Sequence, residues 1–307
     1  MTHVFIDGSA GTTGLRIADR LVLRNDVKLI TLSEENRKDT AARKEAINSA
    51  DIVFLCLPDA AAIEAVSLTE NRAVKIIDTS TAHRTHPDWT YGMPELFGQR
   101  ERVAASHRIA NPGCHASGFI ALVAPLVEQG LLKTDTALSC FSLTGYSGGG
   151  KKMITEYEST DRNPLLKAPR QYALTQQHKH LKEMVAVCGL TTAPVFCPVV
   201  ADFYSGMEVT VPLFAGDITG TVQDIEQLYK AYYTNGLVRF DNGTDADGML
   251  SAAAFSDRDD MQVSVQGNDE RILLTARFDN LGKGASGAAI QNMNILLGID
   301  ETTGLNV

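Results

Sequence analysis

The chain lacks the cysteine pattern of a zinc site or a disulfide framework. Its five cysteines are scattered, odd in number and without a CxxC pair, a usage typical of a reducing compartment. It also lacks an apolar run of roughly 18 residues, the length that a membrane span needs, and a charged segment followed by an apolar one at its start. We therefore expect no metal, no membrane partner, no signal peptide and a cytoplasmic location.

Long charge runs, internal repeats and low-complexity linkers are absent as well. The net charge of −9 argues against nucleic acid as a partner, because nucleic-acid-binding proteins usually present basic patches. What the sequence does have is 307 residues with a hydrophobic fraction of 44%, enough for two domains with real cores. The same charge leaves room for a small anionic substrate, which local basic residues could hold in an acidic protein.

The first third of the sequence alternates strand and helix patterns. Strands are expected at 4–7, 27–32, 51–57 and 74–78, and helices at 14–24, 38–48 and 60–68. The apolar run at 51–57 is typical of a strand buried on both faces. Repeated βα units predict an α/β fold with a parallel, doubly wound sheet, as in a Rossmann domain.

After residue 114 the pattern changes. Strands are expected at 137–144, 195–200, 206–213, 262–265 and 271–278, with few helices between the later ones, and a last helix at 286–297. This order predicts an α+β second domain on a mixed or antiparallel sheet. The turn Pro112-Gly113 is the expected boundary between the two domains.

Cys114 is the first candidate catalytic residue. It follows the Pro112-Gly113 turn, and apolar residues then recur at helical spacing as far as Val127. A thiol at a helix N-terminus is biased toward thiolate, the form that attacks carbonyl carbon. A free cysteine is more often a small buried hydrophobe, which is what we expect of the other four, Cys56, Cys140, Cys188 and Cys197.

A glycine loop joins the first strand to the first helix and is the candidate phosphate site. It reads Gly8, Ser9, Ala10, Gly11, Thr12, Thr13 and Gly14. Glycines allow close approach to a pyrophosphate, and the helix N-terminus offers N–H donors. After the second strand, Ser33 with Arg37 and Lys38 favours a 2′-phosphate and hence NADP(H), while Glu34 or Glu35 would suit NAD. The alternative is that Arg37 and Lys38 are merely solvated.

The candidate proton partners of Cys114 are His178 and His180. His115 is a poor partner, because consecutive helical residues point about 100° apart. Placed on one helix, the two later histidines would diverge by about 200°, so at most one is expected to face the site.

Three further segments carry candidate ligand residues. Arg84 follows a strand end, where ligands of doubly wound folds bind. Ser147, Gly148 and Lys151 lie in a glycine-rich loop suited to an anion, with a flexible loop as the alternative. Gly282 and Lys283 enter the last helix and are assigned to the cofactor, with tight helix packing as the alternative.

Taken together, these motifs resemble N-acetyl-gamma-glutamyl-phosphate reductase, in its shorter variety. The resemblance covers nearly the whole chain and is carried by the motifs GSAGTTG at 8–14, NPGCHASGF at 111–119, LTGYSGGGK at 143–151, HKH at 178–180 and GKGASGAAIQNMN at 282–294. It implies an NADP-binding domain at 1–113, to which 284–307 returns, and a substrate and oligomerisation domain at 114–283. That second domain would be like those of glyceraldehyde-3-phosphate and aspartate-semialdehyde dehydrogenases.

The family resemblance also implies the reaction. N-acetyl-glutamyl 5-phosphate would be reduced with NADPH to the semialdehyde, with release of phosphate, as a step of arginine biosynthesis. Cys114 would be the nucleophile, and His180 the acid/base from a His-x-His-x-Pro-Glu segment. This chain carries Lys182 where that pattern has proline, and His178 is the alternative acid/base. A homo-oligomer is expected from the family.

Other functions are weighed against this one. The nearest is a semialdehyde dehydrogenase that acts on aspartyl phosphate. A non-catalytic NADP-binding regulator is disfavoured by Cys114 with its histidine pair, and a thiol acyltransferase is disfavoured by the glycine loop at 8–14.

Overall fold

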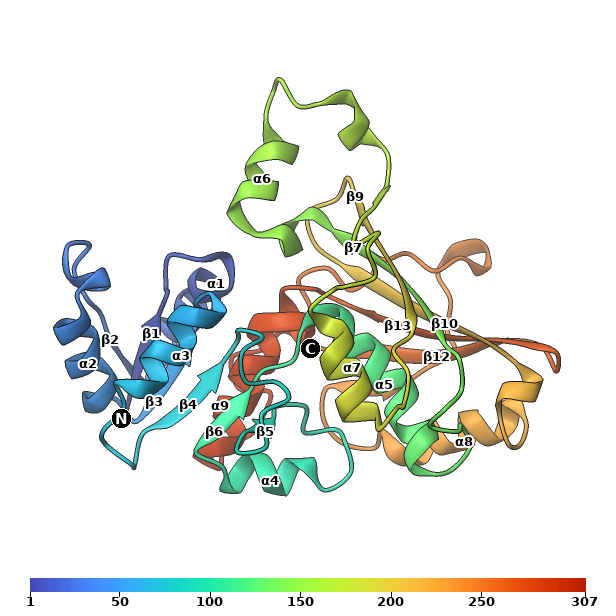
Figure 1. The fold of residues 1–307 in the computed structure, drawn as a ribbon, viewed down its shortest axis with the longest axis horizontal. Helices are drawn as coiled ribbons and strands as arrows, with labels where there is room; N and C mark the ends of the chain where they lie inside the picture. Colours follow the sequence, from blue (N-terminus) through green and yellow to red (C-terminus); the bar gives the residue numbers. More distant parts are fainter. The chain divides into compact units, whose positions relative to one another are not determined.

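The computed structural model describes all 307 residues and divides them into two compact units (Figure 1). The first unit comprises Met1–Pro94, Gly98–Pro112 and Ala285–Leu305, and the second comprises Glu95–Phe97, Gly113–Gly284 and Asn306–Val307. The domain boundaries expected from the sequence follow residues 113 and 283, whereas the boundaries of the two units follow residues 112 and 284. The second unit also includes Glu95–Phe97 and Asn306–Val307, which the sequence assigned to the first domain.

The first unit is built on a six-stranded parallel sheet. Its strands are β1 (Thr2–Asp7), β2 (Val27–Ile30), β3 (Ile52–Leu55), β4 (Lys75–Asp78), β5 (Thr90–Tyr91) and β6 (Arg108–Ala110), in the order β2-β1-β3-β4-β6-β5. Its helices are α1 (Thr12–Leu21), α2 (Thr40–Ser49), α3 (Asp59–Ser67), α4 (Gln99–Ala105) and α9 (Gly287–Leu297), with a 3₁₀ turn η1 at Asn36–Lys38. This is the doubly wound sheet that the sequence predicts.

Both faces of this sheet are buried, because its strands alternate side chains between two cores. Val4 and Ile6 of β1 pack with Ile17 of α1 and Met293 of α9. Phe5, which points the other way, packs with residues of α2 and α3. The carboxyl ends of β1, β2 and β3 therefore lie between two helical layers, where ligands of such folds bind.

The second unit is built on a seven-stranded mixed sheet. Its strands are β7 (Ser139–Gly145), β8 (Arg170–Gln171), β9 (Val195–Ala201), β10 (Met207–Phe214), β11 (Val238–Phe240), β12 (Met261–Gly267) and β13 (Arg271–Phe278), in the order β11-β12-β13-β10-β7-β9-β8. Its helices are α5 (Cys114–Glu128), α6 (Gly150–Glu158), α7 (His180–Cys188) and α8 (Val222–Tyr232). Short turns complete it: η2 (Tyr146–Gly149), η3 (Pro164–Lys167), η4 (Ala215–Asp217) and η5 (Ala246–Gly248). The π-helical η6 (Gly282–Ser286) begins in the second unit and ends in the first.

Helix α5 lies against the middle of this sheet and beside α7 (Figure 1). Nearly all of its residues are buried. A Cβ at Gly118 would lie 2.6 Å from Val209 Cγ2 and 2.9 Å from Phe278 Cε1, so the helix backbone needs glycine there to reach the sheet. The start of α5, which carries Cys114, is thereby fixed by close packing.

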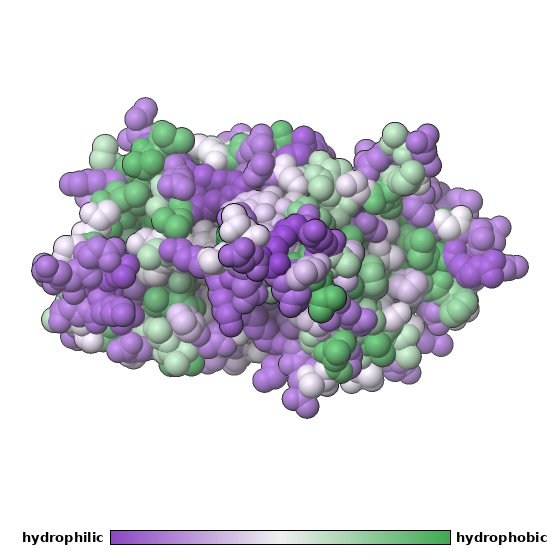
Figure 2. Space-filling model, turned by 90° about the horizontal axis from the view of Figure 1, so that it is seen from above, coloured by the Kyte–Doolittle hydropathy of each residue, from purple (hydrophilic) through white to green (hydrophobic).

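None of the helices combines the length and apolar character needed to cross a bilayer. Figure 2 shows hydrophilic and hydrophobic residues interspersed over the face in view.

Candidate active site

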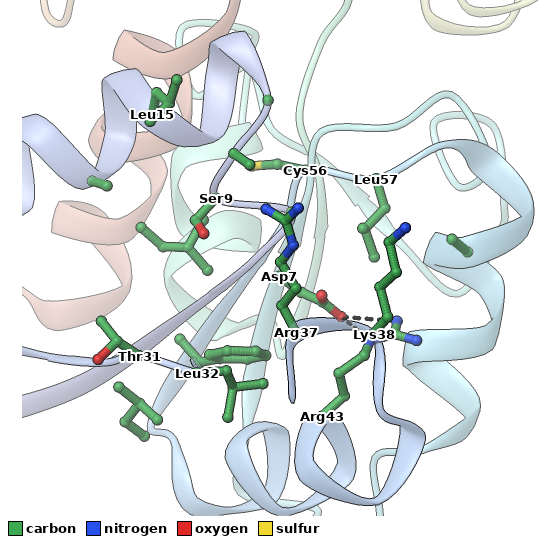
Figure 3. Close-up of a pocket in the computed structure, with 18 of the residues that line it drawn as sticks. Asp7, Ser9, Leu15, Thr31, Leu32, Arg37, Lys38, Arg43, Cys56 and Leu57 are labelled. Atoms are coloured by element: carbon green, nitrogen blue, oxygen red, sulfur yellow. Dashed lines mark hydrogen bonds and ion pairs between the residues drawn. The ribbon is translucent and has the colours of Figure 1, made fainter. Parts of the chain in front are cut away.

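The first unit holds a cavity of about 740 Å³ at the carboxyl ends of β1, β2 and β3 (Figure 3). The predicted glycine loop contributes Gly8, Ser9, Ala10 and Gly11 to its lining, and Arg37 and Lys38 of η1 extend toward it. Its apolar walls come from Leu29, Ile30, Leu32, Cys56 and Leu57. The cavity combines the shape and polarity that a nucleotide needs.

The backbone of the loop allows only glycine at two points. Gly8 has φ +88°, and a Cβ there would lie 2.3 Å from the Cys56 carbonyl oxygen. A Cβ at Gly14 would lie 2.5 Å from the Gly8 carbonyl oxygen, so the first turn of α1 packs directly on the loop. The loop is thus a tight turn that places a helix N-terminus at the cavity, the geometry used to bind phosphate.

Thr12 supplies a second sign of an anion site. It opens α1, and its hydroxyl is buried without a hydrogen-bond partner in the protein. A buried hydroxyl without a partner is costly, and a phosphate oxygen at the helix N-terminus would satisfy it. The loop residues therefore fit a dinucleotide. Thr13 lies in the same first turn of α1.

The residues predicted to receive a 2′-phosphate differ in their contacts. Arg37 forms an ion pair with Glu34, 3.0 Å from nitrogen to oxygen, and both side chains are largely exposed. Ser33 accepts a hydrogen bond from the Asn36 N–H group at 3.4 Å and does not line the cavity. Arg37 is thus partly engaged by an acidic neighbour, whereas Lys38 also lines the cavity.

Arg43 of α2 is a lining residue that the sequence did not reveal. It makes an ion pair with Asp7, 2.9 Å from Nη2 to Oδ2, and both side chains are buried (dashed lines, Figure 3). Burial raises the pKa of the Asp7 carboxyl, and the two Arg43 contacts act against that rise. The pair ties the end of β1, where the glycine loop begins, to α2.

Cys114 occupies the predicted position in the second unit. It is the first residue of α5, and Gly113 is the N-cap with extended backbone angles. The side chain is half-buried. A Cβ at Gly284 in the π-helix would lie 2.9 Å from the Cys114 Cβ, so that segment can approach the cysteine only as glycine. The thiol thus sits at a helix N-terminus, which favours its anion.

Three histidine rings gather beside the start of α5. The rings of His178 and His180 lie 4.7 Å apart, and they lie 5.7 Å and 5.5 Å from the ring of His115. The premise that His178 and His180 lie on one helix, from which the sequence predicts that at most one faces the site, is wrong. Helix α7 begins at His180, so His178 precedes the helix and the 200° argument does not apply to the pair.

His115 is held by two hydroxyl groups. Its Nδ1 lies 2.6 Å from Ser142 Oγ, and its Nε2 lies 2.6 Å from the Tyr172 hydroxyl. Burial lowers the pKa of His115 to about 3, and burial lowers that of His178 to about 4, with Lys179 contributing to both shifts. Both rings are therefore neutral at pH 7.

Tyr172 and Ser142 are residues that the sequence reasoning missed. Burial raises the pKa of the Tyr172 hydroxyl, and the charge of Cys114 raises it further, which places the hydroxyl in the electrostatic reach of the thiol. The loop after Tyr172 holds Ala173 and Gln176 at φ 53° and 57°. Two non-glycine residues in the left-handed region mark a strained loop, and such strain gathers at functional sites.

The remaining cysteines differ from Cys114. Cys140 and Cys188 are buried as expected, whereas Cys56 and Cys197 are half-buried. Burial raises the pKa of Cys56 to about 12 and raises those of Cys140 and Cys188. These three groups stay as thiols at neutral pH and are poor nucleophiles.

The remaining candidate residues lie in three places. Arg84 lies at the carboxyl ends of β4 and β6, where its guanidinium donates to the carbonyl oxygens of Thr79 and Asn111. Ser147 is buried in η2, and its hydroxyl accepts from the Asn280 amide at 3.0 Å. Gly148 lies beside that amide, and Lys151 is exposed on α6. The loop is thus short helical structure and not an open coil.

Gly282 and Lys283 begin the π-helix η6 and belong to the second unit. Lys283 is buried, and its Nζ lies 2.7 Å from Glu95 Oε1 in a fully buried ion pair. A Cβ at Gly282 would lie 2.0 Å from the Arg258 carbonyl oxygen. The observed contacts of both residues are therefore packing contacts within the second unit, and their assignment to the cofactor stays a prediction.

Comparison with known families decides the lineage. Residues 3–105 match the family model "Semialdehyde dehydrogenase, NAD binding domain", and residues 114–280 match "Semialdehyde dehydrogenase, dimerisation domain". N-acetyl-gamma-glutamyl-phosphate reductase 2 of Nostoc sp. is 44% identical, with 98% of each chain covered. The enzyme of the same name from Pseudomonas putida is 44% identical, with 96% of each covered.

The chain belongs to the N-acetyl-gamma-glutamyl-phosphate reductases of the semialdehyde dehydrogenase family. The resemblance read from the motifs is confirmed, and so is the expected fold class. Among solved structures, an aspartate semialdehyde dehydrogenase II of Vibrio cholerae, complexed with ASA, superposes with a TM-score of 0.73 at 15% identity, covering 97% of this chain and 98% of that one. At that identity the likeness concerns the fold alone.

Proposed function

We propose that the chain catalyses the NADPH-dependent reduction of N-acetyl-L-glutamyl 5-phosphate to the 5-semialdehyde with release of phosphate, a step of arginine biosynthesis. The observation that carries this proposal is Cys114 at the first position of α5, beside a cluster of three histidines, in a chain whose other unit has a dinucleotide-type cavity. Relatives at 44% identity bear the name of this activity.

In this proposal Cys114 carries the covalent chemistry. Its thiolate attacks the acyl carbon, the carbon–oxygen bond to phosphate breaks, and a thioester remains on the cysteine. When bound, the reduced nicotinamide supplies the hydride that reduces a thioester carbonyl to the oxidation level of an aldehyde. The Cys114 backbone N–H, at the helix start, stabilises the oxyanion.

His180 is the proposed acid/base, with His178 as the second candidate. It protonates the oxyanion and takes that proton back when the thiohemiacetal releases the aldehyde and Cys114. Burial keeps His178 neutral. His180 is more buried than His178 and is the first residue of α7. Arg84, Ser147, Gly148 and Lys151 stay proposed substrate contacts.

The glycine loop at 8–14 is the proposed holder of the dinucleotide phosphates, with Arg37, Ser33 and Lys38 near the adenosine end. The buried hydroxyl of Thr12 supports a phosphate at the start of α1. We further propose that the active form is a homo-oligomer, since the second unit matches a dimerisation domain, and that it works in the cytoplasm, where its five free cysteines stay reduced.

The test follows the reverse reaction. NADPH formation is measured with N-acetyl-glutamate semialdehyde plus phosphate, and with aspartate semialdehyde plus phosphate, for the wild-type chain, Cys114→Ser and the control Cys197→Ser. We expect activity with the acetylated substrate, lost by far more than about tenfold in Cys114→Ser, because covalent catalysis is worth much more than about 1.4 kcal/mol. A smaller loss overturns the nucleophile, and equal rates with both aldehydes overturn the substrate.

A further inference from the structure

Glu183 is a buried carboxylate that none of the steps above uses. It lies on α7, three residues after His180, and is 1% exposed. Burying a carboxylate is costly unless it is paired or hydrogen-bonded. Its contacts therefore point to the reason for its presence.

The two carboxylate oxygens of Glu183 lie toward the two proposed catalytic residues, one near the turn before Cys114 and the other near His180. Oε2 accepts a hydrogen bond from the Gly113 N–H group at 3.2 Å, and Gly113 is the N-cap directly before Cys114. Oε1 lies 3.9 Å from His180 Nε2. One side chain thus contacts the backbone that presents the nucleophile and the ring of the proposed base.

The signs of the charges decide what such a carboxylate can do. A negative charge beside the thiol would disfavour the thiolate, so Glu183 does not activate Cys114 directly. A negative charge beside His180 favours the protonated ring, and a protonated ring in turn favours the thiolate. The net effect on Cys114 passes through His180.

The other groups around His180 do not supply that charge. The rings of His115 and His178 pack against it and are neutral, because burial lowers the pKa of each. Lys179 precedes it, the exposed Lys182 follows it, and the hydroxyl of Tyr172 contacts His115. Among these neighbours, Glu183 is the anion set against the His180 ring.

We propose that Glu183 is a positioning residue that couples His180 to Cys114, with one oxygen holding the turn before the nucleophile and the other favouring the protonated ring of the base. This inference rests on the assignment of Cys114 and His180 in the proposed function. Its role differs from theirs, since Glu183 acts through both of them.

The variant Glu183→Gln separates the two tasks. Glutamine keeps an oxygen that can accept from the Gly113 N–H but lacks the charge that faces His180. Glu183→Asp keeps the charge and shortens its reach. Glu156→Gln, which removes an exposed glutamate from α6 of the same unit, is the matched control.

Two readouts are needed. The first is kcat and KM. The second is the rate at which iodoacetamide alkylates Cys114 as a function of pH, measured on the Cys114 peptide by mass spectrometry so that Cys56 and Cys197 do not contribute. Thermal unfolding of each variant shows whether it is folded.

We expect Glu183→Gln to lower kcat by about 10- to 100-fold, the same range as the loss on removing outer partners of metal ligands, with KM within about threefold. Its alkylation profile should shift to higher pH, and Glu183→Asp should restore part of that shift. A folded Glu183→Gln with the wild-type kcat and profile overturns the proposal, and so does a kcat loss with an unshifted profile. Wild-type activity in Cys114→Ser would instead overturn the proposed function.

Discussion

At the scale of single residues, His115 shows that a histidine next to the nucleophile in sequence need not act on it. Its ring bridges Ser142 of β7 and Tyr172, which directly follows β8, and both bonds are short at 2.6 Å. Both hydroxyl partners can donate or accept, so a neutral ring satisfies the arrangement with either tautomer. The residue thereby ties the start of α5 to the sheet and to the loop that carries His178.

This arrangement predicts a pH dependence of stability. Burial lowers the pKa of His115 to about 3 in the folded protein, against an ordinary value of 6.5. Between these values the unfolded chain binds more protons, so the contribution is present above pH 6.5 and is lost as pH falls toward 3. From pH 7.5 to 5 the free energy of unfolding should fall by about 2 kcal/mol on this account alone.

The measurement is the urea midpoint of the second unit's unfolding at pH 7.5 and pH 5, for the wild type and His115→Gln. The glutamine variant should be less stable at pH 7.5 and should lose less stability on acidification. A proton NMR titration of the His115 ring checks the cause. A ring that titrates near pH 6.5 in the folded protein would contradict the prediction.

Single residues also show which parts of the site could be predicted from the sequence. Cys114 was predictable because a Pro-Gly turn before a periodic apolar run marks a helix start. The joint orientation of His178 and His180 was not, since it depends on α7 beginning at His180 and on a strained loop before it. That same boundary explains Lys182: it lies in the first turn, where backbone N–H groups need no helical partner and proline and lysine both fit.

At the scale of elements, α5 lacks one backbone hydrogen bond, and a tyrosine at the end of α8 donates in its place. Pro125 lies inside α5 and has no N–H group to donate to the Ala121 carbonyl oxygen. The hydroxyl of Tyr233, which directly follows α8, donates to that oxygen at 2.6 Å. The hydroxyl of Tyr229 on α8 donates to the next carbonyl, that of Leu122. The two tyrosine hydroxyls thus bind α5 at the point where Pro125 interrupts its backbone hydrogen bonds.

This repair can be tested with a double-mutant cycle. Tyr233→Phe should lower the free energy of unfolding by about 1 to 3 kcal/mol, because it leaves a buried carbonyl without a donor. In a Pro125→Ala background the alanine N–H can serve the same carbonyl, so the loss caused by Tyr233→Phe should be smaller. Urea unfolding of the four chains gives the coupling. Equal losses in both backgrounds would show that the hydroxyl and the proline are unrelated.

Elements with strong periodic patterns were also the ones that the sequence located. The long strands β7, β9, β10, β12 and β13 carry apolar residues at alternate positions or in short runs, and each was expected within a few residues. The two-residue strands β5 and β8 carry no readable period. The π-helix η6 depends on tertiary contacts such as the buried Lys283–Glu95 pair, which no local pattern encodes.

At the scale of the whole molecule, the mixed sheet has one covered and one uncovered face. On β10 the buried residues Val209, Val211 and Leu213 point to the helical side, whereas Pro212 and Phe214 are exposed. The register places Phe141 beside Thr210 and Leu273 beside Pro212, on that same exposed side. Large apolar side chains on an uncovered sheet face are typical of an interface, and this unit matches a dimerisation domain.

The last prediction concerns assembly through this face. If a second copy of the chain covers it, Phe141→Asp and Leu273→Asp should each weaken the dimer, because each removes about 1 to 3 kcal/mol of apolar burial and buries a charge. Sedimentation velocity over a range of concentrations should show the wild type as a dimer or larger and both variants dissociating at concentrations at least about tenfold higher. Leu23→Asp, at a position 83% exposed in the first unit, is the matched control and should leave assembly unchanged. Variants that sediment as the wild type would place the interface on another surface.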